Sequence, residues 1–304
     1  MNHGYIHASI PTSALVYGGR DADYLVADRN WRPFLPEFES QLGKDFETMA
    51  CVSFSALNCV ETLLNKKLQS VFNFSDRFTA RMSNTTNRGN TLWNVMQSIE
   101  NDGFINETRY PNNTKTFAEY YQDVPQEIIV EAKGALLRFK VIPEFVPANP
   151  DIMFEALGYA PLQIAMYAYA PKENDIVQRT MMPPSHAIMI YNAKQGEYFE
   201  LFDHYNKNNP FVKVAWDSLF WGAVLYDIQK LPNMQFKDNH IYQLIDPPGG
   251  FYMFAREKLM KIETPDHVLA WLFRAGENWY KQTSAITKAD MEDVDIYNFK
   301  GEKI

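Results

Sequence analysis

The chain is short of cysteine, of basic charge and of long apolar runs. Its 304 residues include two Cys, and 29 Lys and Arg stand against 37 Asp and Glu, which gives a net charge of −8 at pH 7. A nucleic-acid-binding surface is normally basic, so this charge argues against nucleic acid as a partner. No apolar stretch approaches the roughly 18–20 residues needed to span a bilayer, and the first residues lack the basic start and apolar segment of a secretory signal. We therefore expect a cytoplasmic globular protein with no membrane partner.

The two cysteines, Cys51 and Cys59, lie on one predicted helix. At a rise of about 1.5 Å per residue their Cα atoms are roughly 12 Å apart, which is too far for a disulfide. Both thiols are therefore expected to be free, which fits a reducing compartment.

The order of hydrophobic patterns predicts an α+β protein. Apolar residues recur at helical spacing from Cys51 to about Lys67 and again over 91–103. A mixed region follows, with helices expected near 117–122 and 149–157 and a strand near 136–142. The later segments predict strands at 161–167, 186–191, 198–203 and 223–228. This order indicates two lobes, a helical N-terminal lobe and an antiparallel β-rich C-terminal lobe.

Three segments divide the chain. Residues 1–27 form an irregular lead-in, residues 28–231 form the main domain, and residues 232–304 follow a break at Leu231-Pro232. The last segment is predicted to contain a helix at about 265–274. We interpret it as a C-terminal appendage of unknown role and as a possible docking site for a protein partner.

Cys51 is the candidate nucleophile. It stands where a loop turns into a helix, with Thr48 as the expected N-cap, and the N–H groups and dipole of a helix N-terminus favour a thiolate. Cysteine hydrolases also need an imidazole and a group that orients it. His186 and Asp203, far downstream, are the candidates for these roles. His204 is a neighbouring rival base.

Short motifs in chain order support this set. Cys51-Val52-Ser53-Phe54-Ser55 opens the predicted helix, Ser185-His186-Ala187-Ile188 begins a strand, and Tyr198-Phe199-Glu200-Leu201-Phe202-Asp203 forms another. They resemble the Cys-Trp-Ala-Phe-Ser, the His-bearing strand and the Tyr-Trp-Ile-Val-Lys-Asn of the papain family of cysteine peptidases. The spacing from Cys51 to His186 and Asp203 falls in or near the roughly 130–150 residues expected in that family. The resemblance runs over about residues 28–230.

The resemblance implies a papain-like two-lobe fold and a cysteine peptidase that hydrolyses peptide bonds through a thioester. Cys51 attacks, His186 carries the proton, and Asp203 accepts from the imidazole Nδ1–H. The partner is a peptide or protein substrate. No metal and no cofactor is implied.

The resemblance also implies residues around this triad. Gln41 and the backbone N–H of Cys51 are the expected oxyanion donors. Gly89 and Asn90 are expected to border the substrate cleft through their backbone. Either Trp216 or Trp221 is a candidate to shield the His186–Asp203 pair.

The chain departs from the family around the nucleophile. Thr48-Met49-Ala50 replaces Cys-Gly-Ser, and Gln41 stands ten residues before Cys51, where the family's glutamine stands six before. A four-residue insertion reconciles the two spacings. Two alternatives stay open, a catalytically impaired papain-like structural or interaction protein and a related thiol amidase.

The pattern of divergence resembles papain-like open reading frames of large bacteriophages, which would place the protein in the host cytoplasm or in a virion. Only about 27 residues precede the resemblance. A long inhibitory pro-segment of the usual family type is therefore not expected.

Overall fold

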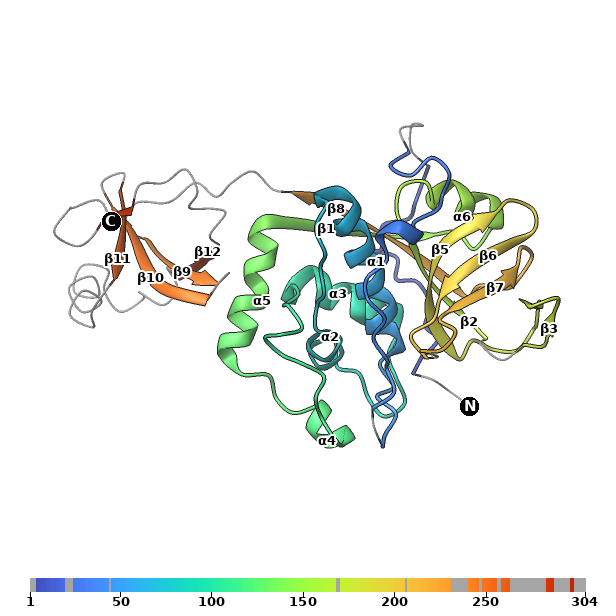
Figure 1. The fold of residues 1–304 in the computed structure, drawn as a ribbon, viewed down its shortest axis with the longest axis horizontal. Coiled ribbons are helices and arrows are strands. Elements are labelled where there is room, and N and C mark those ends of the chain that lie inside the picture. Colours follow the sequence, from blue (N-terminus) through green and yellow to red (C-terminus); the bar gives the residue numbers. More distant parts are fainter. Residues whose placement is uncertain are drawn as a thin grey trace. The chain divides into compact units, whose positions relative to one another are not determined.

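The structure, a computed structural model, is shown in Figure 1. It describes residues 4–19, 24–43, 45–167, 170–205 and 207–230, and beyond these the strands named below. The chain divides into two compact units, one made of Met1–Pro125 and Val141–Gln229, the other of Gln126–Lys140 and Lys230–Ile304. Every residue of the candidate site lies in the first unit.

The first unit begins with a helical part. Its elements are the 3-10 helix η1 (Arg32–Phe34), α1 (Cys51–Leu68), α2 (Asp76–Met82), α3 (Leu92–Asp102) and α4 (Phe117–Tyr120). The side chains of Ser75 and Thr91 cap α2 and α3, each by accepting a backbone N–H of the first turn. Every residue of α1 from Cys51 to Asn65 is buried, so α1 is the central helix of this unit.

An eight-stranded sheet follows, in the order β1-β8-β2-β5-β6-β7-β4-β3. Its strands are β1 (Phe139–Val146), β2 (Leu162–Met166), β3 (Lys172–Glu173), β4 (Ile176–Val177), β5 (His186–Lys194), β6 (Tyr198–Phe202), β7 (Phe211–Ala215) and β8 (Gly222–Lys230), and α6 (Pro150–Ala156) lies between β1 and β2 in the chain. β2 pairs antiparallel with β5 and β8, and β5 pairs antiparallel with β6. β5 therefore lies near the middle of the sheet, where α1 packs on it (Figure 1).

A buried glutamine joins α1 to the sheet. Gln163, on β2, is fully buried, and its Nε2 donates to the carbonyl of Val52 at 2.7 Å and to the hydroxyl of Ser55 at 2.8 Å. Its carbonyl oxygen accepts from the hydroxyl of Tyr226, on β8, at 2.7 Å. Because these bonds involve the first turn of α1, they help to fix the position of Cys51 relative to β5.

The second unit contains α5 (Gln126–Arg138) and a five-stranded sheet in the order β12-β9-β10-β11-β13. These strands are β9 (His240–Ile245), β10 (Pro248–Ala255), β11 (Lys258–Ile262), β12 (Thr283–Ile286) and β13 (Ile296–Tyr297). The helix expected at about 265–274 lies outside the described residues. The expected division into 1–27, 28–231 and 232–304 stays a prediction.

The predicted α+β class, with helices before an antiparallel sheet, is confirmed. The helices expected from Cys51 to Lys67 and over 91–103 are α1 and α3, and the expected strands correspond to β2, β5, β6 and β8. The strand expected near 136–142 begins only at Phe139, because the preceding thirteen residues form α5, which we did not predict. We also missed α2 and β7.

We expect Gln163→Leu to lower the free energy of unfolding by about 1–3 kcal/mol, because the buried hydroxyl of Tyr226 loses its acceptor. Denaturant unfolding followed by circular dichroism measures the change. The exposed Gln229, at the end of β8, provides the matched control, and Gln229→Leu should change stability by less than about 0.5 kcal/mol. Equal stability of the two variants would show that the Gln163 network contributes nothing.

Candidate active site

Cys51 is the first residue of α1, and its side chain is fully buried. The helix N-terminus places the positive end of the helix dipole at this residue, which favours an anionic sulfur. The backbone N–H of Ala187, on β5, donates a hydrogen bond to Sγ over 3.4 Å. The expectation that Thr48 caps the helix is wrong, because Ala50 occupies the N-cap. The Thr48 hydroxyl donates instead to the carbonyl of Gln41, at 2.8 Å.

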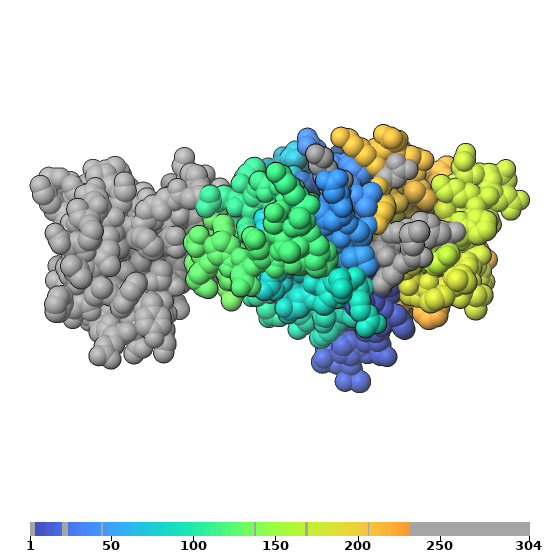
Figure 2. All heavy atoms as spheres, turned by 90° about the horizontal axis from the view of Figure 1, so that it is seen from below, coloured from blue at the N-terminus to red at the C-terminus, as the bar shows by residue number. Residues whose placement is uncertain are grey.

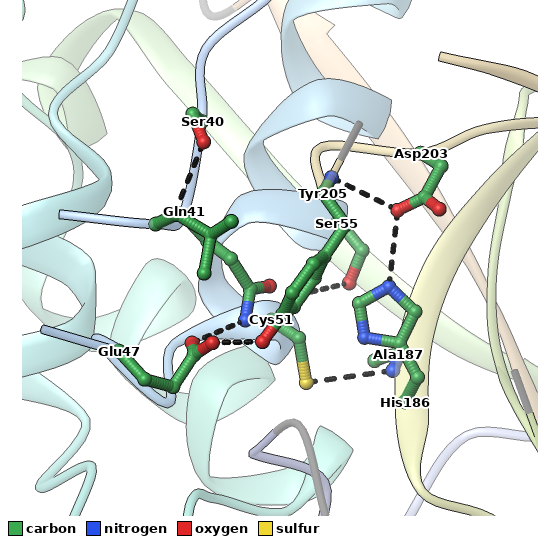
Figure 3. A network of polar contacts seen from close by, with 10 residues as sticks. Ser40, Gln41, Glu47, Cys51, Ser55, His186, Ala187, Asp203 and Tyr205 are labelled. Atoms are coloured by element: carbon green, nitrogen blue, oxygen red, sulfur yellow. Dashed lines mark hydrogen bonds and ion pairs between the residues drawn. The ribbon is translucent and has the colours of Figure 1, made fainter. Parts of the chain in front are cut away.

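His186 opens β5, and Asp203 directly follows β6, the neighbouring strand. The two side chains meet, with His186 Nε2 3.2 Å from Asp203 Oδ1. Our expectation that Asp203 bonds Nδ1 is wrong, because the carboxylate reaches the outer nitrogen of the ring. Figure 3 shows the other ring nitrogen on the side of Cys51. The imidazole thus stands between the carboxylate and the thiol.

Opposing effects decide the charge of His186. Burial lowers its pKa, because a buried site disfavours the charged ring. Hydrogen bonds to Asp203 and Cys51, together with the charges of these two groups, outweigh burial and raise the pKa of His186 to about 10. His186 is therefore charged at neutral pH, and its ring lies beside Cys51.

The pKa of His204, the rival base, is shifted in the opposite direction. Its buried ring stacks on Phe54, with centroids 5.4 Å apart, and lies 5.0 Å from the ring of His186. Burial and the charge of His186 lower the pKa of His204 to about 3. A ring with so low a pKa stays neutral at neutral pH and is a poor acceptor of a second proton, so His186 is the better base.

The structure brings Gln41 to the site despite its unusual spacing. An isolated antiparallel bridge between Leu42 and Glu47 folds the loop back on itself, which takes up the additional residues before Cys51. Gln41 is fully buried, and its backbone N–H donates to the carbonyl of His204 at 3.2 Å. Figure 3 shows its side-chain amide on the side of Cys51 opposite to the His186–Asp203 pair.

Two residues that sequence reasoning missed complete the network in Figure 3, Glu47 and Tyr205. The backbone N–H of Tyr205 donates to Asp203 Oδ1 at 3.0 Å, and its ring stands edge-on to His186, with centroids 5.5 Å apart. The Tyr205 hydroxyl donates to Glu47 Oε2. Glu47 Oε1 accepts from Gln41 Nε2 at 2.7 Å. The only sequence signal for this link is the presence of polar residues near Cys51 and Asp203.

The aromatic ring against the His186–Asp203 pair is therefore that of Tyr205. Trp216, one expected candidate, stacks on Phe199 with centroids 4.6 Å apart. Trp221, the other, meets His7 and is 40% exposed. Both indoles thus have other partners.

The backbone of Asn90 is occupied by residues 4–6 of the chain. Asn90 N–H donates to the carbonyl of Gly4 at 2.8 Å, and Ile6 N–H donates to the carbonyl of Asn90 at 2.7 Å, which makes a short parallel bridge. Gly89 has a φ of +99°, and a Cβ there would lie 2.0 Å from the Gly4 oxygen. In Figure 2 the dark-blue N-terminal residues lie on the surface beside the teal segment that leads into α3. The predicted role of Gly89 and Asn90 in binding substrate stays a prediction.

Residues 4 and 5 also lie close to the thiol. A Cβ on Gly4 would lie 2.2 Å from the carbonyl oxygen of Met49, two residues before Cys51. Tyr5 is buried, and its pKa is raised to about 12 by burial and, to a lesser extent, by its nearness to Cys51. The N-terminal segment therefore packs against the residues that lead into α1 and lies near Cys51.

Solved structures share this fold. The chain is similar to xylellain, a cysteine protease from Xylella fastidiosa, with a TM-score of 0.57 and 14% identity over 76% of this chain and 97% of that one. It is also similar to digestive procathepsin L 3 from the larval midgut of Tenebrio molitor, with a TM-score of 0.52 and 14% identity over 74% and 76% of the two chains. No protein-family model and no curated protein matches the sequence. The likeness shows a papain-like α+β fold, as the order of the motifs predicts.

Within the described part of the chain, no three His, Cys, Asp or Glu side chains are grouped so that they could hold a metal ion. The helices of that part include none with the length and apolar character needed to cross a membrane.

A chain that lacks residues 1–10 is expected to expose the thiol, because Gly4 packs against Met49 and Tyr5 lies near Cys51. Iodoacetamide should then alkylate Cys51 several times faster than in the full chain, as measured by mass spectrometry of the tryptic peptides. Cys59 is the internal control, because it is buried within α1 and burial raises its pKa well above the ordinary value. An unchanged rate at Cys51 would show that other groups limit access to the sulfur.

Proposed function

We propose that the protein is a cysteine peptidase with Cys51, His186 and Asp203 as its triad. The observation that carries the proposal is their convergence: the start of α1, the start of β5 and the residue after β6 bring a thiol, an imidazole and a carboxylate into one chain of contacts. A nucleophile, a base and a group that orients the base are the parts that covalent acyl transfer needs.

The mechanism follows from the orientation of the His186 ring, in which Nε2 faces Asp203 and Nδ1 faces Cys51 (Figure 3). The Cys51 thiolate attacks the carbonyl carbon of the substrate and forms a tetrahedral intermediate. Because Nε2 is held by Asp203, the proton that reaches the leaving amine comes from Nδ1 of His186. The C–N bond breaks, the amine departs and a thioester remains on Cys51. Water, deprotonated by the now neutral His186, attacks the thioester and releases the acid.

Two N–H donors support the developing oxyanion, the backbone of Cys51 and the amide of Gln41. The Gln41 amide nitrogen donates to Glu47 at 2.7 Å, which turns the nitrogen, and not the oxygen, toward that carboxylate. Each such donor is worth about 3 kcal/mol in the transition state.

The backbone N–H and carbonyl of Asn90 support a peptide as the substrate class. These two groups already bind an extended segment, residues 4–6, in the manner of strand addition. A substrate that uses this edge takes the place of that segment.

A second candidate function rests on the burial of the thiol. Cys51 is fully buried and the edge at Asn90 is filled, as expected of a papain-like protein that has kept the fold as an interaction module. The phage branch, and with it a role in a virion, stays a prediction, and so does binding of a protein partner through residues 232–304.

Peptide hydrolysis separates the two candidates. We expect the full chain or the chain without residues 1–10 to cleave a fluorogenic peptide library and to react at Cys51 with an epoxide warhead. Cys51→Ala should lower hydrolysis at least about a thousandfold, because the nucleophile is lost. Cys59→Ala is the matched control and should leave the rate unchanged. If neither form of the chain hydrolyses peptide or labels at Cys51, the protein is not a cysteine peptidase.

A further inference from the structure

We propose that Glu47 is a positioning residue of the catalytic centre, which holds the amide of Gln41 in the orientation that presents an N–H to the oxyanion. This inference rests on the proposed function. Glu47 touches none of the reacting atoms and acts through Gln41.

The carboxylate of Glu47 joins two loops that are far apart in the sequence. Oε1 accepts from Gln41 Nε2 at 2.7 Å and from the backbone N–H of Met49 at 3.1 Å. Oε2 accepts from the hydroxyl of Tyr205, whose own backbone N–H bonds Asp203. One side chain thus connects the candidate oxyanion donor with the loop that carries the orienting carboxylate.

Gln41 needs such a partner for a geometric reason. The last torsion of a glutamine has a broad, roughly two-fold preference, so the amide can turn its oxygen or its nitrogen to the same point. A turned amide would present its oxygen to the oxyanion and repel it. A carboxylate accepts hydrogen bonds and donates none, so Glu47 selects the orientation in which Nε2 faces it.

The backbone around Gln41 does not depend on Glu47 alone. The Thr48 hydroxyl bonds the Gln41 carbonyl, and the Gln41 N–H bonds the His204 carbonyl. Loss of the Glu47 carboxylate should therefore remove one constraint on the Gln41 amide while the loop keeps its course.

The net effect of its surroundings is to raise the pKa of Glu47 above the ordinary value. The groups that face it are the hydroxyls of Tyr205 and Tyr121 and the imidazolium of His186. Burial raises the pKa of Glu47, whereas the bonds from Gln41 and Met49 and the charge of His186 act in the opposite direction. Substitutions of Glu47 must therefore distinguish the loss of a hydrogen-bond acceptor for Gln41 from the loss of a negative charge.

The test compares Gln41→Ala, Glu47→Leu, Glu47→Gln and the double variant Gln41→Ala/Glu47→Leu. Two rates are measured for each, kcat/KM for a peptide and alkylation of Cys51 by iodoacetamide, which needs no oxyanion donor. Gln41→Ala should lower kcat/KM about 100-fold, as expected for loss of one oxyanion donor. Glu47→Leu should lower it at least tenfold, and the double variant should match Gln41→Ala, because Glu47 acts through Gln41. Alkylation should stay within about threefold of the native rate.

Glu47→Gln keeps an acceptor oxygen for Gln41, because the backbone N–H of Met49 bonds the same oxygen and holds it on that side, and this variant should retain most of the activity. The exposed Glu37, in the same N-terminal loop region, supplies the matched control, and Glu37→Leu should leave both rates unchanged. Should Glu47→Leu fail to fold, Glu47→Ala takes its place, and circular dichroism checks each variant.

Three results would overturn the proposal. They are a Glu47→Leu enzyme within threefold of the native kcat/KM, a double variant whose loss is the product of the two single losses, and a Glu47→Gln enzyme as impaired as Glu47→Leu. If neither the native chain nor the chain without residues 1–10 cleaves peptide or labels at Cys51, the proposed function is refuted instead.

Discussion

The contact between the start of α1 and the start of β5 is the interaction on which the candidate site depends. It sets the sulfur of Cys51 against the backbone N–H of Ala187 and against the ring of His186. The pair is buried, so a charged ring there would be unstable without partners. Asp203, which follows the next strand, supplies the compensating negative charge. The hydrogen bonds of Gln163 fix the first turn of α1 against the sheet. Because β6 lies beside β5 in the sheet, Asp203 stands next to His186 and stabilises its charged ring.

Two further segments of the chain pack around this contact. The loop before Cys51 folds back so that Gln41 and Glu47 meet, and Tyr205 ties that loop to the Asp203 turn. The N-terminal residues then pair with the backbone of Asn90. A peptide that used the backbone of Asn90 would have to displace this segment, so reactivity of the sulfur and access to it are separate properties of the molecule.

Much of this arrangement could be predicted from motif order. Cys51, His186 and Asp203 sit at element boundaries that short patterns mark well, and a simple insertion explains the position of Gln41. The Glu47–Tyr205 bond could not be predicted, because it joins residues 158 apart. Both residues lie in loops, and hydrophobic periodicity does not predict the course of a loop. The ring nitrogen that meets Asp203 could not be predicted either. We missed α5 because we extended the strand pattern that begins at Phe139 back into the last residues of this helix.

The protonation state of His186 as a function of pH tests the central claim most directly. Nitrogen NMR of protein labelled in its imidazole rings measures it, with His186→Gln to assign the signal. The account predicts a ring that stays charged through neutral pH and loses its proton near pH 10, because hydrogen bonds to Asp203 and Cys51 outweigh burial. It also predicts that Cys51→Ala lowers that pH. A ring that is neutral at pH 7, or that titrates near the ordinary value of about 6.5, would contradict the account.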